Sequence, residues 1–561
     1  MFKEVIAELI AKKADVSKEQ ILKLIEVPPK PEFGDFSFPC FSLAGKLKKA
    51  PAEIAQELGK IKLPKEIKEI KVVGAYINFF VNKEILASSV VDEILKQKDN
   101  YGRNEYGKGK KVMVEYSSPN TNKPMHLGHL KNNSIGMSIS NILEFSGYKV
   151  IKANLFSDRG AHICKVMYAY EKLSKQKEPR KQKPDHFVGD LYVLYAKKEN
   201  EKMKEEILKM LQKWENKDKK TRALWEKMNK WVIKGLKETY KNFGSKFDVV
   251  FKESQFYKKA KDIIKEGLKK KVFFKNEDKA VVAKLDPLPD KIILRKDGTS
   301  LYITNDLALT RHKFDKFKLD ESVWVTGSEQ KLYFEQLFRI FFLLGFKWYN
   351  QCKHVPYGMV LLESGKMKSR EGTVVDADDM IAEITELAKK EILQREKVNK
   401  NELGRRAIAI ALAAIKFYLL KVDPDKDTLF NPHKAVSFEG YTGPYLQYAH
   451  ARASNILKKA EKGKKQGKAD YSLLKMPEEL ELISKLNEFS EIVKSSSNKL
   501  SPALIANYAY QLCQIFANFY EKCQVINADK ERDARIALVK AFKQVLENSL
   551  KLLDIEPLER M

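Results

Sequence analysis

Three segments within residues 112–156 decide the fold: VMVEY at 112–116, SSPNTNKP at 117–124 and YKVIKANLF at 148–156. The first and last are short apolar segments typical of strands, and the middle one is a cluster of turn-forming residues. Between them, apolar residues recur at a helical spacing, at Ile135, Ile139 and Ile142, up to Gly147. This order of strand, loop, helix and strand predicts a βαβ unit of a parallel sheet. Ligands of such sheets bind where strand ends meet helix N-termini.

The flanking sequence predicts two further domains around this unit. Residues 1–105 combine helical periodicity with an alternating, strand-like run at residues 72–81 and predict a small α/β domain. We expect a Rossmann-type parallel-sheet catalytic domain at 106–385, with a Lys- and Glu-rich helical insertion at about 166–289 and strand-like segments returning at KIILR and SVWVTG. From 386 to 561 nearly every segment has helical period, which predicts an all-α bundle. The predicted fold class is multidomain α/β.

The composition is strongly basic. The 561 residues include 104 Lys and Arg against 75 Asp and Glu, a formal net charge of +29, which suits a polyanionic partner such as nucleic acid. A solvated lysine-rich surface is an equally open reading of charge alone. The cysteines contain no Cys-x-x-Cys pair, which argues against a disulfide framework or a cysteine zinc site. No signal-peptide core or membrane-spanning segment is evident, so we expect a soluble, cytoplasmic protein.

The loop after the first predicted strand carries two histidines. His126 and His129 flank Gly128 at the start of the predicted helix, where backbone N–H groups and the helix dipole favour phosphate. Both imidazoles can face one ligand, and the missing Cβ of Gly128 lets a nucleotide approach the backbone. A metal pair or packed histidines would explain the pattern equally well, although no third metal ligand is evident.

HLGH at 126–129 resembles the HIGH signature of class I aminoacyl-tRNA synthetases, and the surrounding EYSSPN and KPMHLGHLKNNSIG resemble the arginyl-tRNA synthetases in particular. GKMKSREGTVV at 365–375 resembles the second class I signature, the KMSKS loop. Ser369 stands where many class I enzymes have a catalytic lysine. The resemblance implies that Lys123, just upstream of HLGH, compensates, with Lys366 and Lys368 in supporting roles. It also implies that ATP contacts a further set of residues: His126, Gly128, His129, Gly327, Met359 and Lys366.

A guanidinium is planar and always charged, so an arginine site needs carboxylates and other acceptors around it. In LYITNDLALTRHKF, Tyr302 and Asp306 lie four residues apart, on one face if the segment is helical, and resemble the arginyl family's Tyr-x-x-x-Asp pair. Core packing of the tyrosine and a cap or surface pair of the aspartate are the alternatives. Asn305 departs from the family's usual arginine. The resemblance implies further arginine contacts from Glu115, Ser118, Asn120 and Gln330.

The C-terminal third offers aromatic and amide groups for unpaired RNA bases. FEGYTGPYLQYAHARASNIL at 438–457 resembles the start of the arginyl family's anticodon-binding bundle. The residues expected to stack on or read anticodon bases are Tyr441, Tyr445, Tyr448, Asn518 and Tyr520. For each of them, core packing at helical spacing is an equally open reading. The N-terminal domain resembles the family's extension that contacts the tRNA elbow.

The implied reaction is ATP-dependent activation of L-arginine to arginyl-adenylate, followed by transfer to the 3′-terminal adenosine of tRNA(Arg), with AMP and pyrophosphate as products. The expected catalysis is positioning and charge stabilisation, with Mg²⁺ arriving on ATP and no dedicated protein metal site. We expect a monomer without a membrane partner. The alternatives are a sister synthetase for cysteine or glutamate, or an inactive paralogue that binds tRNA.

Overall fold

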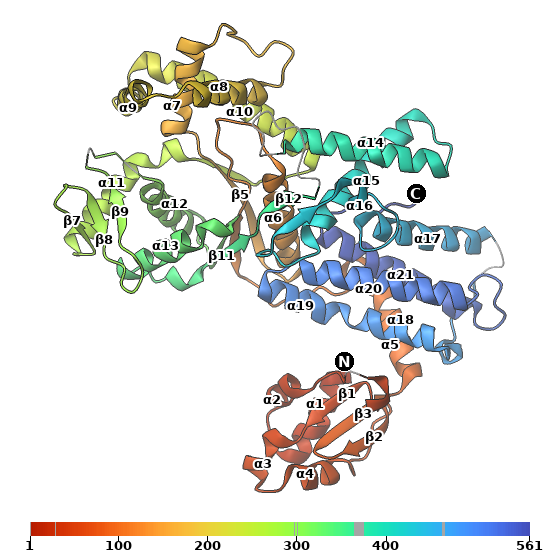
Figure 1. The fold of residues 1–561 in the computed structure, drawn as a ribbon. Coiled ribbons are helices and arrows are strands. Elements are labelled where there is room, and N and C mark those ends of the chain that lie inside the picture. Colours follow the sequence, from red (N-terminus) through yellow and green to blue (C-terminus); the bar gives the residue numbers. More distant parts are fainter. Residues whose placement is uncertain (1, 29, 297, 300, 364–374, 463–465) are drawn as a thin grey trace. The chain divides into compact units, whose positions relative to one another are not determined.

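The computed structural model describes residues 2–28, 30–296, 298–299, 301–363, 375–462 and 466–561 (Figure 1). The chain divides into two compact units. The first comprises Met1–Tyr101, Ile456–Glu488 and Gln514–Val545, and the second comprises Gly102–Asn455, Phe489–Cys513 and Leu546–Met561. The predicted boundaries at 105 and 385 remain predictions. Within the described ranges, none of the helices combines the length and the apolar character that crossing a bilayer requires.

The first unit contains a small antiparallel sheet with strand order β1-β3-β2. Its strands are β1 (Phe36–Pro39), β2 (Ile67–Val73) and β3 (Tyr76–Val81). The N-terminal helices are α1 (Phe2–Ala14), α2 (Lys18–Leu24), α3 (Phe41–Leu47), α4 (Pro51–Leu58) and α5 (Lys83–Gln97). The strand predicted over residues 72–81 is in fact a hairpin, because Gly74 adopts φ +59° and turns the chain between β2 and β3.

The second unit is built on a five-stranded parallel sheet of order β11-β10-β4-β5-β6 (Figure 1). The strands are β4 (Lys111–Glu115), β5 (Lys149–Phe156), β6 (Val249–Lys252), β10 (Glu321–Gly327) and β11 (Cys352–Tyr357). Counted along the chain from β4, this is the Rossmann order 3-2-1-4-5, in which ligands bind at the switch point between the first and fourth strands. The predicted βαβ unit is confirmed as β4, α6 (Leu127–Phe145) and β5.

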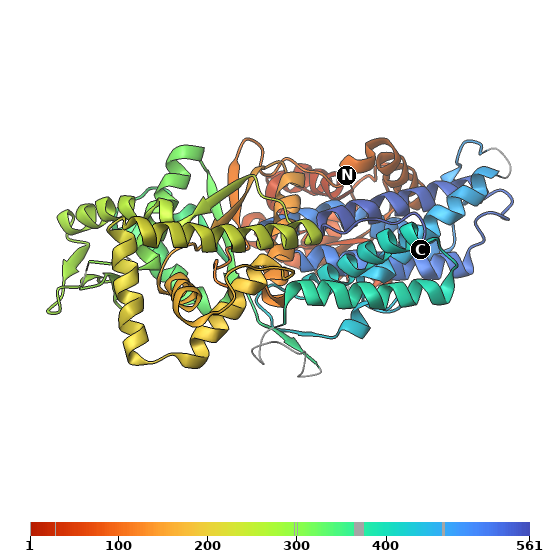
Figure 2. The same cartoon turned by 90° about the horizontal axis from the view of Figure 1, so that it is seen from above.

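Helices precede and follow β6 along the chain. Between β5 and β6 lie α7 (Ala161–Tyr168), α8 (Pro184–Lys198), α9 (Glu201–Glu215) and α10 (Lys219–Phe243), which form one group in Figures 1 and 2. After β6 come α11 (Tyr257–Lys269) and a small antiparallel sheet of β7 (Phe273–Lys275), β8 (Val281–Ala283) and β9 (Lys291–Leu294). The largely helical insertion expected at about 166–289 remains a prediction. Within that range, β6 is a short edge strand of the main sheet that pairs with β5.

Further helices follow the small antiparallel sheet along the chain. Helices α12 (Tyr302–Phe317) and α13 (Lys331–Leu343) share an apolar core with the sheet, to which Met113, Phe251 and Trp324 contribute. Then follow β12 (Val360–Leu362), α14 (Ala377–Arg395), α15 (Lys400–Leu420), β13 (Thr428–Phe430), which pairs with β12, and α16 (Pro432–Ala435). The C-terminal helices are α17 (Gly443–Lys462), α18 (Pro477–Asn487), α19 (Phe489–Lys499), α20 (Ala503–Lys522) and α21 (Arg532–Leu552).

Candidate active site

The two histidines of HLGH cap helix α6. His126 is the N-cap residue, and its Nδ1 accepts a hydrogen bond from the backbone N–H of Gly128 at 3.2 Å. Nδ1 of His129 accepts in turn from the backbone N–H of His126 at 3.2 Å, and the two ring centroids are 4.0 Å apart. Because both Nδ1 atoms are acceptors, each neutral ring carries its proton on Nε2. The motif therefore holds two N–H donors at a helix N-terminus.

Both imidazoles are neutral at pH 7. Burial lowers the pKa of His126 to about 4, and the positive charge of Lys123 lowers it further. Burial and the neighbouring His126 and Lys123 lower the pKa of His129 well below its ordinary value. The charge at this end of α6 therefore comes from Lys123, which is half-buried, while the histidines supply neutral donors. A Cβ on Gly128 would lie 3.0 Å from the His126 ring, a tight contact that would press on the ring.

The backbone at the first signature pairs with the end of the second signature and with the residues just after it. The N–H of Leu127 donates to the carbonyl of Val375 at 2.9 Å, and the N–H of Ala377 donates to the carbonyl of Met125 at 3.1 Å. Lys366 and Lys368 lie outside the described residues. Gly327 ends β10 at the switch point, and Met359 lies between β11 and β12 with 60% of its surface exposed.

Glu115 ends β4, the first strand in Rossmann order, and is buried. Its Oε2 accepts from Nζ of Lys313 on α12 at 2.5 Å, and the lysine side chain is fully buried. The same ammonium lies 4.9 Å from the ring centroid of Trp324. Glu115, the carboxylate expected to bind the substrate, thus already has an internal counter-ion in Lys313. Sequence reasoning missed Lys313, although it follows Asp306 by seven residues on the same helical face.

Tyr302 and Asp306 do share the first turns of α12. The Tyr302 hydroxyl forms a hydrogen bond with Nδ1 of His162 at 3.2 Å, and 52% of the tyrosine is exposed. Asp306 accepts a hydrogen bond from the hydroxyl of Tyr333. Burial raises the pKa of Asp306 to about 6, even though this hydrogen bond stabilises the ionised form. Core packing is therefore excluded as the role of Tyr302, because its side chain reaches solvent.

A third carboxylate lies near this pair and was not assigned from the sequence. Glu253 follows β6, and its Oε1 accepts from Nδ2 of Asn305 at 2.7 Å. Its other oxygen, Oε2, is buried without a hydrogen-bond partner in the described part of the chain. Burial raises the pKa of Glu253 to about 8, with Arg159 lowering it and Asp306 raising it. Asn305, the departure from the family pattern, thus holds a buried acid.

The loop after β4 is held in an unusual conformation. Ser117 and Ser118 have φ values of 73° and 44°, a left-handed region that residues other than glycine rarely adopt. The backbone N–H of Ser118 donates to Oδ1 of Asn154 at 3.1 Å. Asn120 and Gln330 are exposed, the latter in the 3₁₀ turn directly after β10. Ser118, Asn120 and Gln330 therefore gather at the carboxyl ends of β4 and β10.

The five residues expected to meet the anticodon fall in both units. In the second unit, the Tyr441 hydroxyl donates to the carbonyl of Lys421 at 3.2 Å, and its ring lies 4.5 Å from that of Tyr510. The Tyr445 ring packs on Tyr510 at 5.8 Å, and the Tyr448 hydroxyl accepts from Arg452 at 2.9 Å. In the first unit, Asn518 and Tyr520 are exposed on α20.

Three family models match consecutive parts of the chain. They are described as Arginyl tRNA synthetase N terminal domain at residues 1–81, tRNA synthetases class I (R), catalytic domain at 90–431, and DALR anticodon binding domain at 446–561.

Individual relatives agree with these matches over almost the full chain. An arginine–tRNA ligase of Treponema denticola is 45% identical over 562 residues, covering 96% of this chain and 94% of the relative. An arginine–tRNA ligase of Borreliella burgdorferi is 39% identical over 574 residues, covering 99% and 98%. The solved structure of Thermus thermophilus arginyl-tRNA synthetase matches with a TM-score of 0.82 and 27% identity, covering 100% of both chains. The chain belongs to the arginyl-tRNA synthetase family of class I aminoacyl-tRNA synthetases.

Proposed function

We propose that the chain, acting as an arginine–tRNA ligase, forms arginyl-adenylate between the N-terminus of α6 and the carboxyl ends of β4 and β10. The observation that carries this proposal is the meeting of two kinds of group at one switch point. Neutral histidine donors with a nearby lysine suit phosphate, and buried carboxylates suit a guanidinium. Sheets of this order bind ligands at that point.

In the first step, an oxygen of the arginine carboxylate attacks the α-phosphorus of ATP and pyrophosphate leaves. His126 and His129 donate Nε2–H groups to phosphate oxygens, and Lys123 supplies the positive charge that the neutral rings lack. In the second step, a ribose hydroxyl of the terminal adenosine of tRNA(Arg) attacks the activated carbonyl and AMP leaves. No protein nucleophile takes part, so positioning and charge stabilisation account for catalysis. Lys366, Lys368, Gly327 and Met359 remain predicted ATP contacts.

The charges around the guanidinium pocket support arginine as the substrate. Glu115 is paired with Lys313, and Arg159 is paired with Glu215 at 2.6 Å, so these four charges balance. Asp306 and Glu253 add negative charge when ionised, which suits a guanidinium. A glutamate side chain would add further negative charge and be repelled. In this proposal Tyr302 and Gln330 complete the pocket, and Ser118 and Asn120 bind the amino-acid portion.

Mg²⁺ enters with ATP, and the metal neutralises charge on the phosphates. Asp376 and Asp378, which follow the second signature in the sequence, are engaged by Lys183 and His186 and are not offered to a metal. The thiols of all five cysteines are unpaired and buried, which supports a reducing, cytoplasmic compartment. The monomeric state stays a prediction.

We extend the proposal to the anticodon-binding helices. Of the five predicted residues, Asn518 and Tyr520 are the best placed to meet unpaired bases, because both are exposed. Tyr441 packs against Tyr510, which suits a supporting role. Because the chain carries a net charge of +29, we expect phosphate contacts to contribute much of the tRNA affinity.

Lys123→Ala tests the assignment of the phosphate charge. Removing one group that stabilises developing charge typically costs about 10²–10³ in kcat, and we expect a loss of this size in arginine-dependent ATP–pyrophosphate exchange with tRNA present. Lys123→Arg should retain part of the rate, and Lys108→Ala, an exposed lysine in the loop before β4, should retain all of it. Unchanged exchange in Lys123→Ala would refute the role of Lys123.

A further inference from the structure

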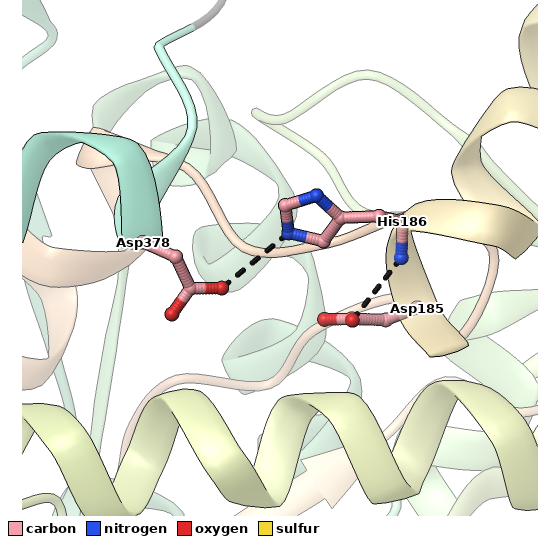
Figure 3. A group of neighbouring side chains, drawn as sticks. All are labelled: Asp185, His186 and Asp378. Atoms are coloured by element: carbon pink, nitrogen blue, oxygen red, sulfur yellow. Dashed lines mark hydrogen bonds and ion pairs between the residues drawn. The ribbon is translucent and has the colours of Figure 1, made fainter. Parts of the chain in front are cut away.

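A network of charged side chains lies where the starts of α8 and α14 meet α10. Nζ of Lys183 is 2.6 Å from Oδ2 of Asp378 and 3.0 Å from Oδ2 of Asp185, and it donates to Oγ1 of Thr239 at 2.5 Å. His186 Nε2 lies 3.4 Å from Oδ2 of Asp378 (Figure 3). The same nitrogen is 3.4 Å from a carboxylate oxygen of Asp376. The network joins residues almost 200 positions apart in the chain.

Asp185, His186 and Asp378 have the chemistry of a divalent-metal site, because their ligand atoms lie within 4.8 Å of one another (Figure 3). The ammonium of Lys183 already contacts both of these carboxylates, however, and an ammonium so placed repels a metal ion. This group is therefore an ion-pair network with its own internal cation.

The pKa shifts of His186 and Asp378 agree with this assignment. Burial disfavours the charged form of His186, yet its hydrogen bond to Asp378 and the charges of Asp376 and Asp185 raise its pKa overall. Burial likewise opposes ionisation of Asp378, but His186, Lys183 and Thr239 lower its pKa. The N-terminal dipole of α14 also favours negative charge at Asp376 and Asp378.

The network secures a segment that contacts the first signature directly. Asp376 is the N-cap of α14, and its Oδ1 accepts from the backbone N–H of Asp378 at 2.8 Å. Residues 375–377 form the backbone pairing with Met125 and Leu127 described above, with Asp376 opposite His126. In the sequence, the second signature ends at Val375. The network therefore acts on the backbone that carries His126 and on the last residue of the second signature.

Buried residues of α8 and α10 support the network. Asp185 is fully buried against α10, where a Cβ added to Gly235 would lie 2.1 Å from its Oδ1. Gly235 therefore permits a close approach of the two helices that a side chain would prevent. Thr239, one turn further along α10, is also fully buried and contacts both Lys183 and Asp378. A displacement of Asp378 is thus resisted from α8 and α10 together.

We propose that Lys183, His186 and Asp378 are positioning residues for adenylate formation, which hold residues 375–377 against Met125–Leu127 and so fix His126 toward the ATP phosphates. The inference rests on the proposed role of His126. None of the three residues touches a substrate in this account; each acts through the backbone pairing. Replacing them should therefore lower kcat/KM for ATP and leave KM for arginine, which binds at β4 and α12, almost unchanged.

The test compares Asp378→Asn, Lys183→Met and the double variant in tRNA-supported ATP–pyrophosphate exchange. Small misplacements of a catalytic group cost up to roughly a hundredfold in rate, and we expect kcat/KM for ATP to fall about ten- to a hundredfold in each single variant. KM for arginine should change less than about twofold, and the double variant should be no worse than the poorer single one. Lys183→Arg should restore most of the loss.

Asp379→Asn is the matched control, because Asp379 is exposed on the same helical turn and should leave all constants unchanged. His186→Gln, which keeps a hydrogen-bond donor, replaces Lys183→Met if that variant does not fold. An equal rise in KM for arginine and KM for ATP, or unchanged ATP kinetics in folded variants, would overturn the proposal, provided that the wild-type chain still exchanges pyrophosphate. A wild-type chain without arginine-dependent exchange would instead overturn the proposed function on which the inference rests.

Discussion

Replacing Lys313 with methionine removes the ammonium that pairs with buried Glu115. The two charged atoms are 2.5 Å apart, and the side chains of Lys313 and Glu115 are 0% and 7% exposed. At an effective dielectric constant of about 20, their attraction is about 7 kcal/mol, and the cost of removing both charges from water offsets part of it. Breaking such a pair from one side typically costs about 3–5 kcal/mol. We expect the free energy of unfolding to fall by about this amount.

Urea unfolding followed by tryptophan fluorescence measures this change, because Trp324 lies 4.9 Å from the Lys313 ammonium. The double variant Lys313→Met/Glu115→Gln removes both charges and should return to within about 2 kcal/mol of the wild type. Lys316→Met, an exposed change one turn along the same helix, should stay within about 0.5 kcal/mol.

A loss below about 1 kcal/mol in Lys313→Met, or a double variant as unstable as the single one, would refute the reasoning. Either result would mean that Glu115 does not depend on Lys313 for its buried charge. Lys313 would then not be the internal counter-ion that the pocket is proposed to contain.

Three further predictions concern the substrates. Asp306→Asn removes a half-buried carboxylate from the proposed guanidinium site and should raise KM for arginine by roughly 10²–10³, while KM for ATP changes less than about threefold. Steady-state exchange kinetics measure both constants, and a small change in KM for arginine would exclude the residue. The raised pKa values of Asp306, about 6, and Glu253, about 8, leave these acids protonated and neutral at low pH, so KM for arginine should fall as pH rises from about 5.5 to 8.5. A Glu253→Gln variant should lose the upper part of that profile, and a flat wild-type profile would contradict the assignment. Finally, log affinity for tRNA should fall linearly with log salt, by about 0.7 to 0.9 per phosphate contact, in a filter-binding titration, whereas salt-independent binding would argue against phosphate contacts.

Much of the fold followed from the sequence because its strands and helices carry their own periodicity. The predicted βαβ unit at 112–156 became β4, α6 and β5, and the helical C-terminal third and the multidomain α/β class were confirmed. Strand β6 escaped detection, because VVFK is four residues long and lies among lysines. KIILR was predicted as a strand but joins the small antiparallel sheet as β9, since strand pairing depends on contacts distant in sequence.

The candidate site was only partly predictable. Short motifs identify His126, His129, Tyr302 and Asp306 because their spacing is local, and their roles remain proposals. Glu253 could not be found this way, since its meaning comes from burial beside Asp306 and Asn305, which are about fifty residues away. The pairing of Lys183 with Asp378 spans an even longer stretch of chain, and neither residue is unusual within its own segment.

The central claim, that this site activates arginine, is tested most directly by ATP–pyrophosphate exchange with each of the twenty amino acids, with tRNA(Arg) present and absent. The account predicts exchange that depends on arginine alone when tRNA is present, and its loss in Asp306→Asn. Exchange with cysteine or glutamate would identify a sister synthetase. The contradicting result is no exchange with any amino acid by a folded chain that still binds tRNA(Arg), which would identify a tRNA-binding protein without synthetase activity.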